Sequence, residues 1–433
     1  MWSFFTEAPV RLPPVGWQNR IYFCSDDGFL YCVNAEDGTL EWKFSGAPNS
    51  QHVIGNQRLT SAWPARGGPV VRDGQVYFAA SIWPFMGTFI YASTPSRERS
   101  SGSTIVRAHY IKQPHSAPSF AGVAPQGALV ATENELIVPG GRSVPAVFDR
   151  ATGSLRYFEL NAGGKGSGAS FVAAADDFFY VHTREKGTRA FNITTGLKTA
   201  FMPNEPVLAA GTIYSAELVE ERPVIRAYGT DEQLKWEIEA DGTGDLILAG
   251  NKLIAAGVVT SPRFVCRRTT SQPRSCFNSL AERIERLLVA SVKLFAVTLD
   301  GKLLAFGDST AADENSKSEP SELANRDPQT GWDISAADQR AVKEMLGSSP
   351  AEGFAFWFGS TDSGVARCLA TQSPFEQLAM VDSDASRVER MRREMDAARI
   401  EGVTQHLSAA AAFSRAAVCR EYAVYCSRVG GEY

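Results

Sequence analysis

Short apolar runs alternate with glycine-bearing turns along the first 300 or so residues of the chain. The clearest copy, "NRIYFCSDDGFLYCVNAEDGTLEWKF" (19–44), consists of two apolar runs, an Asp-Gly turn and a last run that contains Trp42. Glycine allows the positive φ that tight turns need, and a neighbouring Asp or Thr can hydrogen-bond the turn backbone. The segment therefore predicts an antiparallel sheet built from consecutive hairpins.

The same pattern recurs along the chain with a period of about 40 residues. Further copies stand at 134–158, 177–201 and 211–236, and partial copies at 73–92, 251–256 and 293–306. This period is typical of β-propeller blades, because a small sheet has two apolar faces that only its neighbours can cover. We therefore predict a mainly β chain in which residues 1–307 form seven four-stranded blades, with eight as the alternative.

Two finer expectations follow from a propeller. The closing aromatic residues of the repeats, such as Trp42 and Trp236, are predicted to pack between blades. The N-terminal stretch "MWSFFTEAPVRLPPV" is expected to add a strand to the blade that closes the ring, because closure removes exposed sheet edges.

The pattern changes after residue 307. Residues 308–334 are polar, acidic and poor in apolar side chains, so they cannot offset the entropy of ordering and are predicted to be a flexible linker. Residues 335–433 then alternate between helix-like and strand-like patterns of apolar residues. Helices are expected from Ser335 to about Gly347, at 363–372 and at 384–398. Strands are expected at 353–359, 376–382 and 402–408. This alternation predicts a partial α/β, Rossmann-like domain with a parallel sheet.

Charge and composition narrow the functional classes. The net charge is −5, and the acidic excess is concentrated around the predicted linker, so nothing favours nucleic acid as a partner. No signal peptide and no membrane span are expected, which suggests a soluble chain. The 7 cysteines contain no CxxC pair and are expected to be buried thiols, and the 5 histidines have no metal-like spacing, so no metal site is predicted.

The repeat resembles a known family. The motif "DG-x-L-Y-x-[LV]-[DN]-A-x-[DT]-G-x-L-x-W", strongest in 19–44, is similar to the pyrroloquinoline quinone (PQQ)-like repeat of quinoprotein dehydrogenases and of the outer-membrane assembly lipoprotein. The blocks at 58–92 and 110–127 resemble large bacterial proteins that join such a propeller to an S-adenosylmethionine (SAM)-dependent methyltransferase-like domain. The resemblance implies a periplasmic or secreted origin if the N-terminus is incomplete.

The resemblance does not carry PQQ with it. Quinoprotein enzymes use adjacent cysteines in a disulfide, with carboxylate and amide ligands for calcium, and this chain has no Cys-Cys pair or matching ligand set. Loops of a propeller converge on its central funnel, so polar loop residues are candidates for a ligand or partner site. These are Arg66, Lys112, His115, Arg142, Lys165 and His182. The alternative, which we favour, is that they solvate turns or pair with neighbours.

The turn "FGSTDSG" and the later Asp382 resemble class I SAM-dependent methyltransferases. There, a glycine-rich turn lets the backbone approach the cofactor, and a carboxylate at the end of the next strand binds the ribose hydroxyls. Gly359 and Asp382 match, whereas Thr361 and Ser363 stand where glycines are expected, so their side chains intrude. The resemblance implies that these four residues are the cofactor-binding set, although the piece is too short for a complete methyltransferase sheet.

These observations predict a non-catalytic propeller scaffold with a degenerate methyltransferase-like tail and no catalytic residues. Its expected partner is a protein or a small molecule at the propeller face, and SAM is the cofactor that stays open. The alternative is an enzyme, either a PQQ-type oxidoreductase or a SAM-dependent methyltransferase whose catalytic part is incomplete in this chain.

The repeat breaks in three places. Arg- and Ser-rich segments interrupt the repeat abruptly at 93–109 and 258–285, and residues 409–433 lack the pattern of further sheet strands. Genuine insertions and frame-shifted sequence both account for this, and we favour the second. It predicts poor packing of 93–109 and 258–285 and two blades that lack strands.

Overall fold

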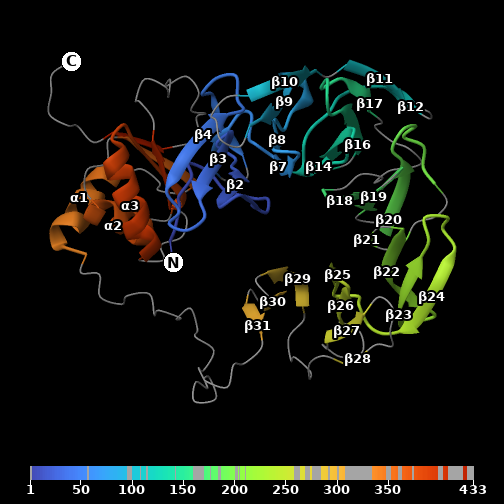
Figure 1. The fold of residues 1–433 in the computed structure, drawn as a ribbon. Helices are drawn as coiled ribbons and strands as arrows, with labels where there is room; N and C mark the ends of the chain where they lie inside the picture. Colours follow the sequence, from blue (N-terminus) through green and yellow to red (C-terminus); the bar gives the residue numbers. More distant parts are fainter. Residues whose placement is uncertain are drawn as a thin grey trace, which may run out of the picture. The chain divides into compact units, whose positions relative to one another are not determined.

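The computed structural model describes most of the repeat region and part of the tail, in separate stretches of the chain (Figure 1). They are residues 2–55, 58–94, 100–107, 109–113, 116–141, 143–158, 170–175, 177–183, 187–199, 203, 205–209, 211–257, 264–268, 274–275, 284–290, 293–299, 302–307, 334–347, 353–358, 363–372, 375–397, 403–407 and 423–426. The chain divides into two compact units, one formed by 1–107 with 318–433 and the other by 108–317. Each unit is described by itself.

The first unit opens with a four-stranded antiparallel sheet, drawn in blue in Figure 1. Its strands are β1 (Val15–Trp17), β2 (Arg20–Cys24), β3 (Phe29–Asn34) and β4 (Leu40–Ser45), in the order β1-β2-β3-β4. Cys32 pairs with Tyr22 on one side and with Trp42 on the other, so these three side chains share one face of the sheet.

A second sheet in the same unit packs on that face. Strands β7 (Gly67–Arg72), β8 (Gln75–Ala80), β9 (Thr88–Ser93) and β10 (Ser100–Val106) form it in sequence order, and the hairpin β5 (His52–Gly55) and β6 (Arg58–Ser61) precedes it. Tyr22 and Trp42 of the first sheet share a buried cluster with Val76 and Phe78 of β8. The prediction that Trp42 packs between blades is confirmed.

The N-terminal segment does not add a strand to a closing blade, as the sequence suggested. Residues 2–14 contain no strand, and β1 pairs only within the first sheet, with β2. The prediction was wrong because the segment has better partners nearby. The indole nitrogen of Trp2 donates to the carbonyl of Ala35 (3.1 Å), and Phe4 packs edge-on against Phe23 and Tyr31. We call residues 2–14 the N-terminal strap.

The second unit repeats the same kind of sheet. Its elements are the hairpin β11 (His109–Gln113) and β12 (Ser116–Ala121), then β13 (Gly127–Ala128), β14 (Val130–Ala131), β15 (Glu135–Gly140), β16 (Ser143–Asp149), β17 (Leu155–Tyr157), β18 (Val172–Ala175), β19 (Phe178–Thr183), β20 (Gly187–Asn192), β21 (Val207–Ala209), β22 (Thr212–Val219), β23 (Arg222–Tyr228), β24 (Leu234–Glu239), β25 (Asp245–Ala249), β26 (Lys252–Ala256), β27 (Phe264–Arg268), β28 (Arg274–Ser275), β29 (Ile284–Ala290), β30 (Lys293–Thr298) and β31 (Leu303–Phe306). Antiparallel meanders form from β14–β17, β18–β20, β21–β24, β25–β28 and β29–β31.

Buried clusters in this unit lie between consecutive sheets. Ile137 and Val147 pack against Phe179 and Phe191 of the following sheet, and the later sheets are joined in the same way. Successive sheets that bury their faces against one another are the packing of a β-propeller, so the mainly β propeller class is confirmed. The predicted number of blades is not. Among the described residues before residue 308, five sheets have four or more strands, while β18–β20 and β29–β31 have three.

The geometry of the repeat is reproduced far along the chain. Tyr214 and Trp236 have ring centroids 5.9 Å apart at an interplanar angle of 45°, and Tyr22 and Trp42 have 5.9 Å and 49°. In both sheets one residue of the middle strand pairs with each member of the aromatic pair. The similar sequences therefore fold into the same local structure.

The segments that break the repeat nevertheless supply strands. β10 lies inside 93–109 and pairs with β9, and β27 and β28 lie inside 258–285 and extend the sheet of β26. The prediction that two blades lack strands was therefore wrong. β10 packs poorly, as expected: no described side chain of 102–107 is buried, and Ile105 is 57% exposed. Packing within 258–283 lies outside the described side chains.

The tail has the predicted alternation of helices and strands. It consists of α1 (Ala336–Leu346), β32 (Gly353–Phe358), α2 (Ser363–Gln372), β33 (Phe375–Asp382), α3 (Ala385–Ala397), β34 (Val403–Leu407) and β35 (Ala423–Cys426). The four strands are parallel, in the order β34-β33-β32-β35. Ser335 begins α1 in a capping box with Asp338, as its sequence indicated. Residues 308–333 of the predicted linker lie outside the described residues, and the proposed domain boundaries stay predictions.

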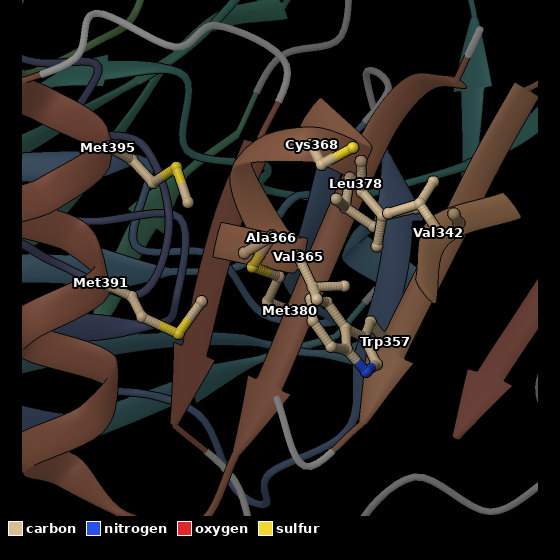
Figure 2. Packing of buried hydrophobic residues seen from close by; sticks show 11 residues of the cluster. Val342, Trp357, Val365, Ala366, Cys368, Leu378, Met380, Met391 and Met395 are labelled. Carbon is tan, nitrogen blue, oxygen red and sulfur yellow. The ribbon is translucent and has the colours of Figure 1, made fainter. Parts of the chain in front are cut away.

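One face of the tail sheet packs on the three helices. Trp357 of β32 and Met380 of β33 contact Val365 of α2 and Met391 of α3 in a buried cluster (Figure 2). No helix in the described part of the chain is long and apolar enough to cross a membrane.

Candidate functional site

Arg66 is the only predicted funnel residue whose side chain the structure describes, and it is already engaged. Its Nε and Nη2 donate to the two carboxylate oxygens of Asp26 (2.9 and 3.0 Å), and Arg11 of the strap donates to Asp26 as well (2.5 Å). The Asp26 side chain is 1% exposed. Such a bidentate, charge-assisted pair holds the guanidinium in place. For Arg66 this is the alternative that the sequence left open, in which the residue pairs with a neighbour.

The other five funnel candidates cannot be brought together from the described residues. Lys112 lies in β11 and His182 in β19, with side chains outside the description. His115, Arg142 and Lys165 lie outside the described residues altogether. A site formed by this set therefore stays a prediction.

A buried carboxylate that the sequence did not single out lies beside Asp26. Asp27 accepts hydrogen bonds from the Tyr31 hydroxyl (2.6 Å), the Phe29 amide (3.0 Å) and the Glu7 amide (3.1 Å). Burial raises the pKa of Asp27 to about 6, although these hydrogen bonds oppose the rise. The sequence carried a signal for this in "SDDG", where two aspartates follow each other in one turn. If another segment packs over such a turn, at least one of the two carboxylates becomes buried.

Asp382 is the best-described member of the predicted cofactor set. It ends β33, is 5% exposed, and accepts from Arg387 through both oxygens (2.8 and 3.0 Å) and from the Asp384 amide (2.8 Å). Burial alone would raise the pKa of Asp382, but the hydrogen bonds from Arg387 and from the Asp384 amide, together with the positive charge of Arg387, outweigh burial and lower the pKa. Both oxygens that would bind ribose hydroxyls thus already accept charge-assisted hydrogen bonds from Arg387.

The rest of the cofactor set is described only in part. Ser363 is the first residue of α2, and its side chain lies outside the description, as do Gly359 and Thr361 entirely. Phe358 pairs with Val381, so β32 ends at the same sheet edge that carries Asp382. Whether these residues bind a cofactor stays a prediction.

An exposed aromatic pair stands on the connection between β8 and β9. Trp83 and Phe85 are 50% and 60% exposed, and their rings are stacked with centroids 5.8 Å apart. The backbone beneath them forms a 3₁₀ turn (Pro84–Met86), closed by the Met86 and Gly87 amides that donate to Trp83 and Pro84.

Buried contacts hold this connection. The indole nitrogen of Trp63 donates to the Met86 carbonyl (3.1 Å), and Met86 packs with Trp63, Ala80 and Phe89. The pair is thus presented on a braced backbone rather than a long loop. A signal for this pair was present in "SIWPFMG", where a turn-forming proline stands between two aromatic residues.

The described residues contain no group of His, Cys, Asp and Glu side chains placed to hold a metal ion. Arg226 of β23 binds Glu217 of β22 (2.8 Å) and Glu237 of β24 (2.7 Å), so one ion-pair network joins three neighbouring strands.

Comparisons with known proteins give fold-level likenesses. No family model matches the chain, and no curated protein matches it. Similar solved structures include BamB from Moraxella catarrhalis, at 13% identity over 71% of this chain and 86% of that one (TM-score 0.44). The computationally designed protein Ika8 is 12% identical over 70% and 84% (0.46). The quinohemoprotein alcohol dehydrogenase from Comamonas testosteroni is 11% identical over 70% and 66% (0.44). Likenesses of this size decide nothing about function.

Proposed function

We propose that this chain is a non-catalytic β-propeller scaffold that binds a protein partner through the exposed pair Trp83 and Phe85. The braced aromatic pair is the observation that carries the proposal. Tryptophan and other aromatic side chains supply large contact area with few rotatable bonds, and they are enriched where binding energy concentrates. A periplasmic or secreted setting, which the repeat's resemblance implies, suits such a scaffold.

The chemistry of this surface favours a protein over a charged ligand. Residues 74–93, which include β8, β9 and the connection between them, contain no charged side chain, and β10 contains none either. Ile105 of β10 lies beside Gly87 and is also exposed. A neutral, aromatic projection is complementary to an apolar pocket on a partner, and its binding should depend weakly on salt.

Site-specific photo-cross-linking tests this function. Benzoylphenylalanine placed at position 85 should capture one protein from a lysate of the source organism, and Trp83→Ala in the same chain should reduce its yield. The matched control carries the photoreactive residue at position 197, because Leu197 is also a strongly exposed apolar residue (68%). The same products at both positions, or none at position 85, would contradict the proposal.

We further propose that the tail does not serve as a SAM-dependent methyltransferase, and that the chain takes no PQQ. For SAM, the support is that Arg387 occupies both carboxylate oxygens of Asp382. A ribose would have to displace a charge-assisted bidentate pair with neutral hydroxyls. For PQQ, the support is the missing pair of adjacent cysteines.

Isothermal titration calorimetry of SAM into the full chain tests the first part. We expect no saturable heat up to about 1 mM SAM, the limit of weak specific binding. Arg387→Ala exposes the Asp382 carboxylate, so binding that appears only in this variant would support the ion pair as the obstacle. Saturable binding by the unaltered chain would refute the proposal.

A further inference from the structure

At β32 and β33, the second face of the tail sheet packs against the propeller part of the same unit. Phe356 and Ala379 pair across β32 and β33 and point away from the helix-packed face, since they alternate with Trp357 and Met380. They are 5% and 8% exposed, and they share a buried cluster with Leu59 of β6 and with Ile54 of β5.

Parallel sheets are stable when both faces are covered. In the described tail, α1, α2 and α3 all belong to the cluster on one face, whereas the β5–β6 hairpin covers the other. The hairpin therefore takes the place that a second layer of helices has in a doubly wound fold.

A second contact joins the tail to the N-terminal strap. Arg392 of α3 binds the Glu7 carboxylate at 2.7 Å, and the two side chains are only 9% and 19% exposed. Burial lowers the pKa of His52 on β5, and the negative charge of Glu7 partly offsets this. Burial raises the pKa of Tyr31, and the positive charge of Arg392 partly offsets that rise. The strap and α3 therefore meet at Glu7, and His52 of β5 and Tyr31 of β3 lie within reach of the charges of this pair.

Glu7 also holds the strap to the first sheet through its backbone. Its amide donates to Asp27, and the next residues of the strap are fixed by Ser25, which donates to the Ala8 carbonyl (2.8 Å), and by the Asp26 amide, which donates to Pro9 (3.0 Å). A single residue thus links the turn of the first sheet to the last described helix of the tail.

We propose that the tail is a clasp: by covering the β5–β6 hairpin and binding Glu7, residues 336–397 hold the N-terminal strap on the first sheet. This assigns the tail a role within the fold that is independent of any cofactor. It holds whether or not the Trp83–Phe85 pair is the partner site.

Hydrogen exchange of the strap amides in the full-length chain tests the clasp. Arg392→Ala and Glu7→Ala should each accelerate exchange of residues 2–14 at least about tenfold, because each leaves a buried charge without its partner. Arg393→Ala is the matched control, since Arg393 is the next residue of α3, is 61% exposed and pairs only locally with Glu389 (2.7 Å). It should change strap exchange by less than about twofold.

Two further variants keep the test decisive. The double variant Glu7→Ala with Arg392→Ala should exchange no faster than the faster single variant, because the two changes remove one shared contact. The charge exchange Glu7→Lys with Arg392→Glu should slow exchange relative to Glu7→Lys alone. If Arg392→Ala unfolds α3, Glu7→Ala still tests the contact from the strap. Equal strap exchange in Arg392→Ala and Arg393→Ala, or additive effects of the two alanine changes, would overturn the proposal.

Discussion

At the scale of single residues, the buried Asp27 carboxylate should make stability depend on pH. Burial raises its pKa in the folded chain to about 6 from the ordinary 3.8. Between these values the folded chain binds more protons than the unfolded chain, so stability falls as pH rises from about 4 to about 6 and is level above that. A shift of this size corresponds to about 3 kcal/mol.

The measurement is urea unfolding of the unaltered chain and of Asp27→Asn at pH 4.5 and pH 7. Other carboxylates add their own pH dependence, but they are common to both proteins, so the difference between the two proteins isolates Asp27. Asp27→Asn should lose stability relative to the unaltered chain at pH 4.5 more than at pH 7, by up to about 2 kcal/mol. An equal difference at both pH values would show that the Asp27 pKa is ordinary.

Sequence alone could not nominate Asp27, and it could not show that Arg66 is already paired with Asp26. The surroundings of the two aspartates depend on the strap, which brings Arg11 to Asp26 and the Glu7 amide to Asp27. Arg11 lies 15 positions from Asp26 and Glu7 lies 20 positions from Asp27, so the local sequence pattern does not predict either contact. By contrast, Ser335 and Asp338 contact each other over three positions, and that cap was predictable.

At the scale of elements, the turn that follows β20 is hydrogen-bonded to the preceding sheet, which contains β17. Gly196 has φ of 68°, and the Tyr157 hydroxyl of β17 donates to the Ile193 carbonyl in the same turn (2.8 Å). A Cβ added at Gly196 would lie 2.8 Å from the Tyr157 ring. Gly211 has the same φ of 68° but open space around it, so it is a matched control.

Gly196→Ala and Gly211→Ala therefore separate backbone strain from sheet-to-sheet packing. Gly211→Ala should cost about 1 kcal/mol for the left-handed backbone alone. Gly196→Ala should cost at least about 1 kcal/mol more, because the Tyr157 ring must move. Chemical denaturation of the two variants measures this. Equal losses would mean that the turn does not lock the two sheets together.

The elements themselves were largely predictable because their signals are local. The three tail helices and the strands β32, β33 and β34 lie within one or two residues of the predicted ranges. The strands inside 93–109 and 258–285 were not predicted, because these Arg- and Ser-rich segments lack the apolar pattern of the other strands. There, pairing with β9 and β26 overrides a weak sequence signal.

At the scale of the whole molecule, the tail forms one compact unit with the first 107 residues. Periodicity shows which face of a strand is apolar but not which partner covers it. The continuous apolar run at 353–359 indicates a strand covered on both faces, and Phe356 within it is buried. That Leu59, almost 300 positions earlier, supplies part of the cover could not be read from the chain.

The central claim is that this molecule acts by binding a protein through Trp83 and Phe85. The most direct measurement uses the partner protein that cross-linking identifies, purified in its free form. It is titrated into the unaltered chain, into the double variant Trp83→Ala with Phe85→Ala, and into the control variant Leu197→Ala. The account predicts that the double variant binds at least about 30-fold more weakly, which corresponds to about 2 kcal/mol, while Leu197→Ala stays within about twofold. Equal affinities of the unaltered chain and the double variant would contradict it.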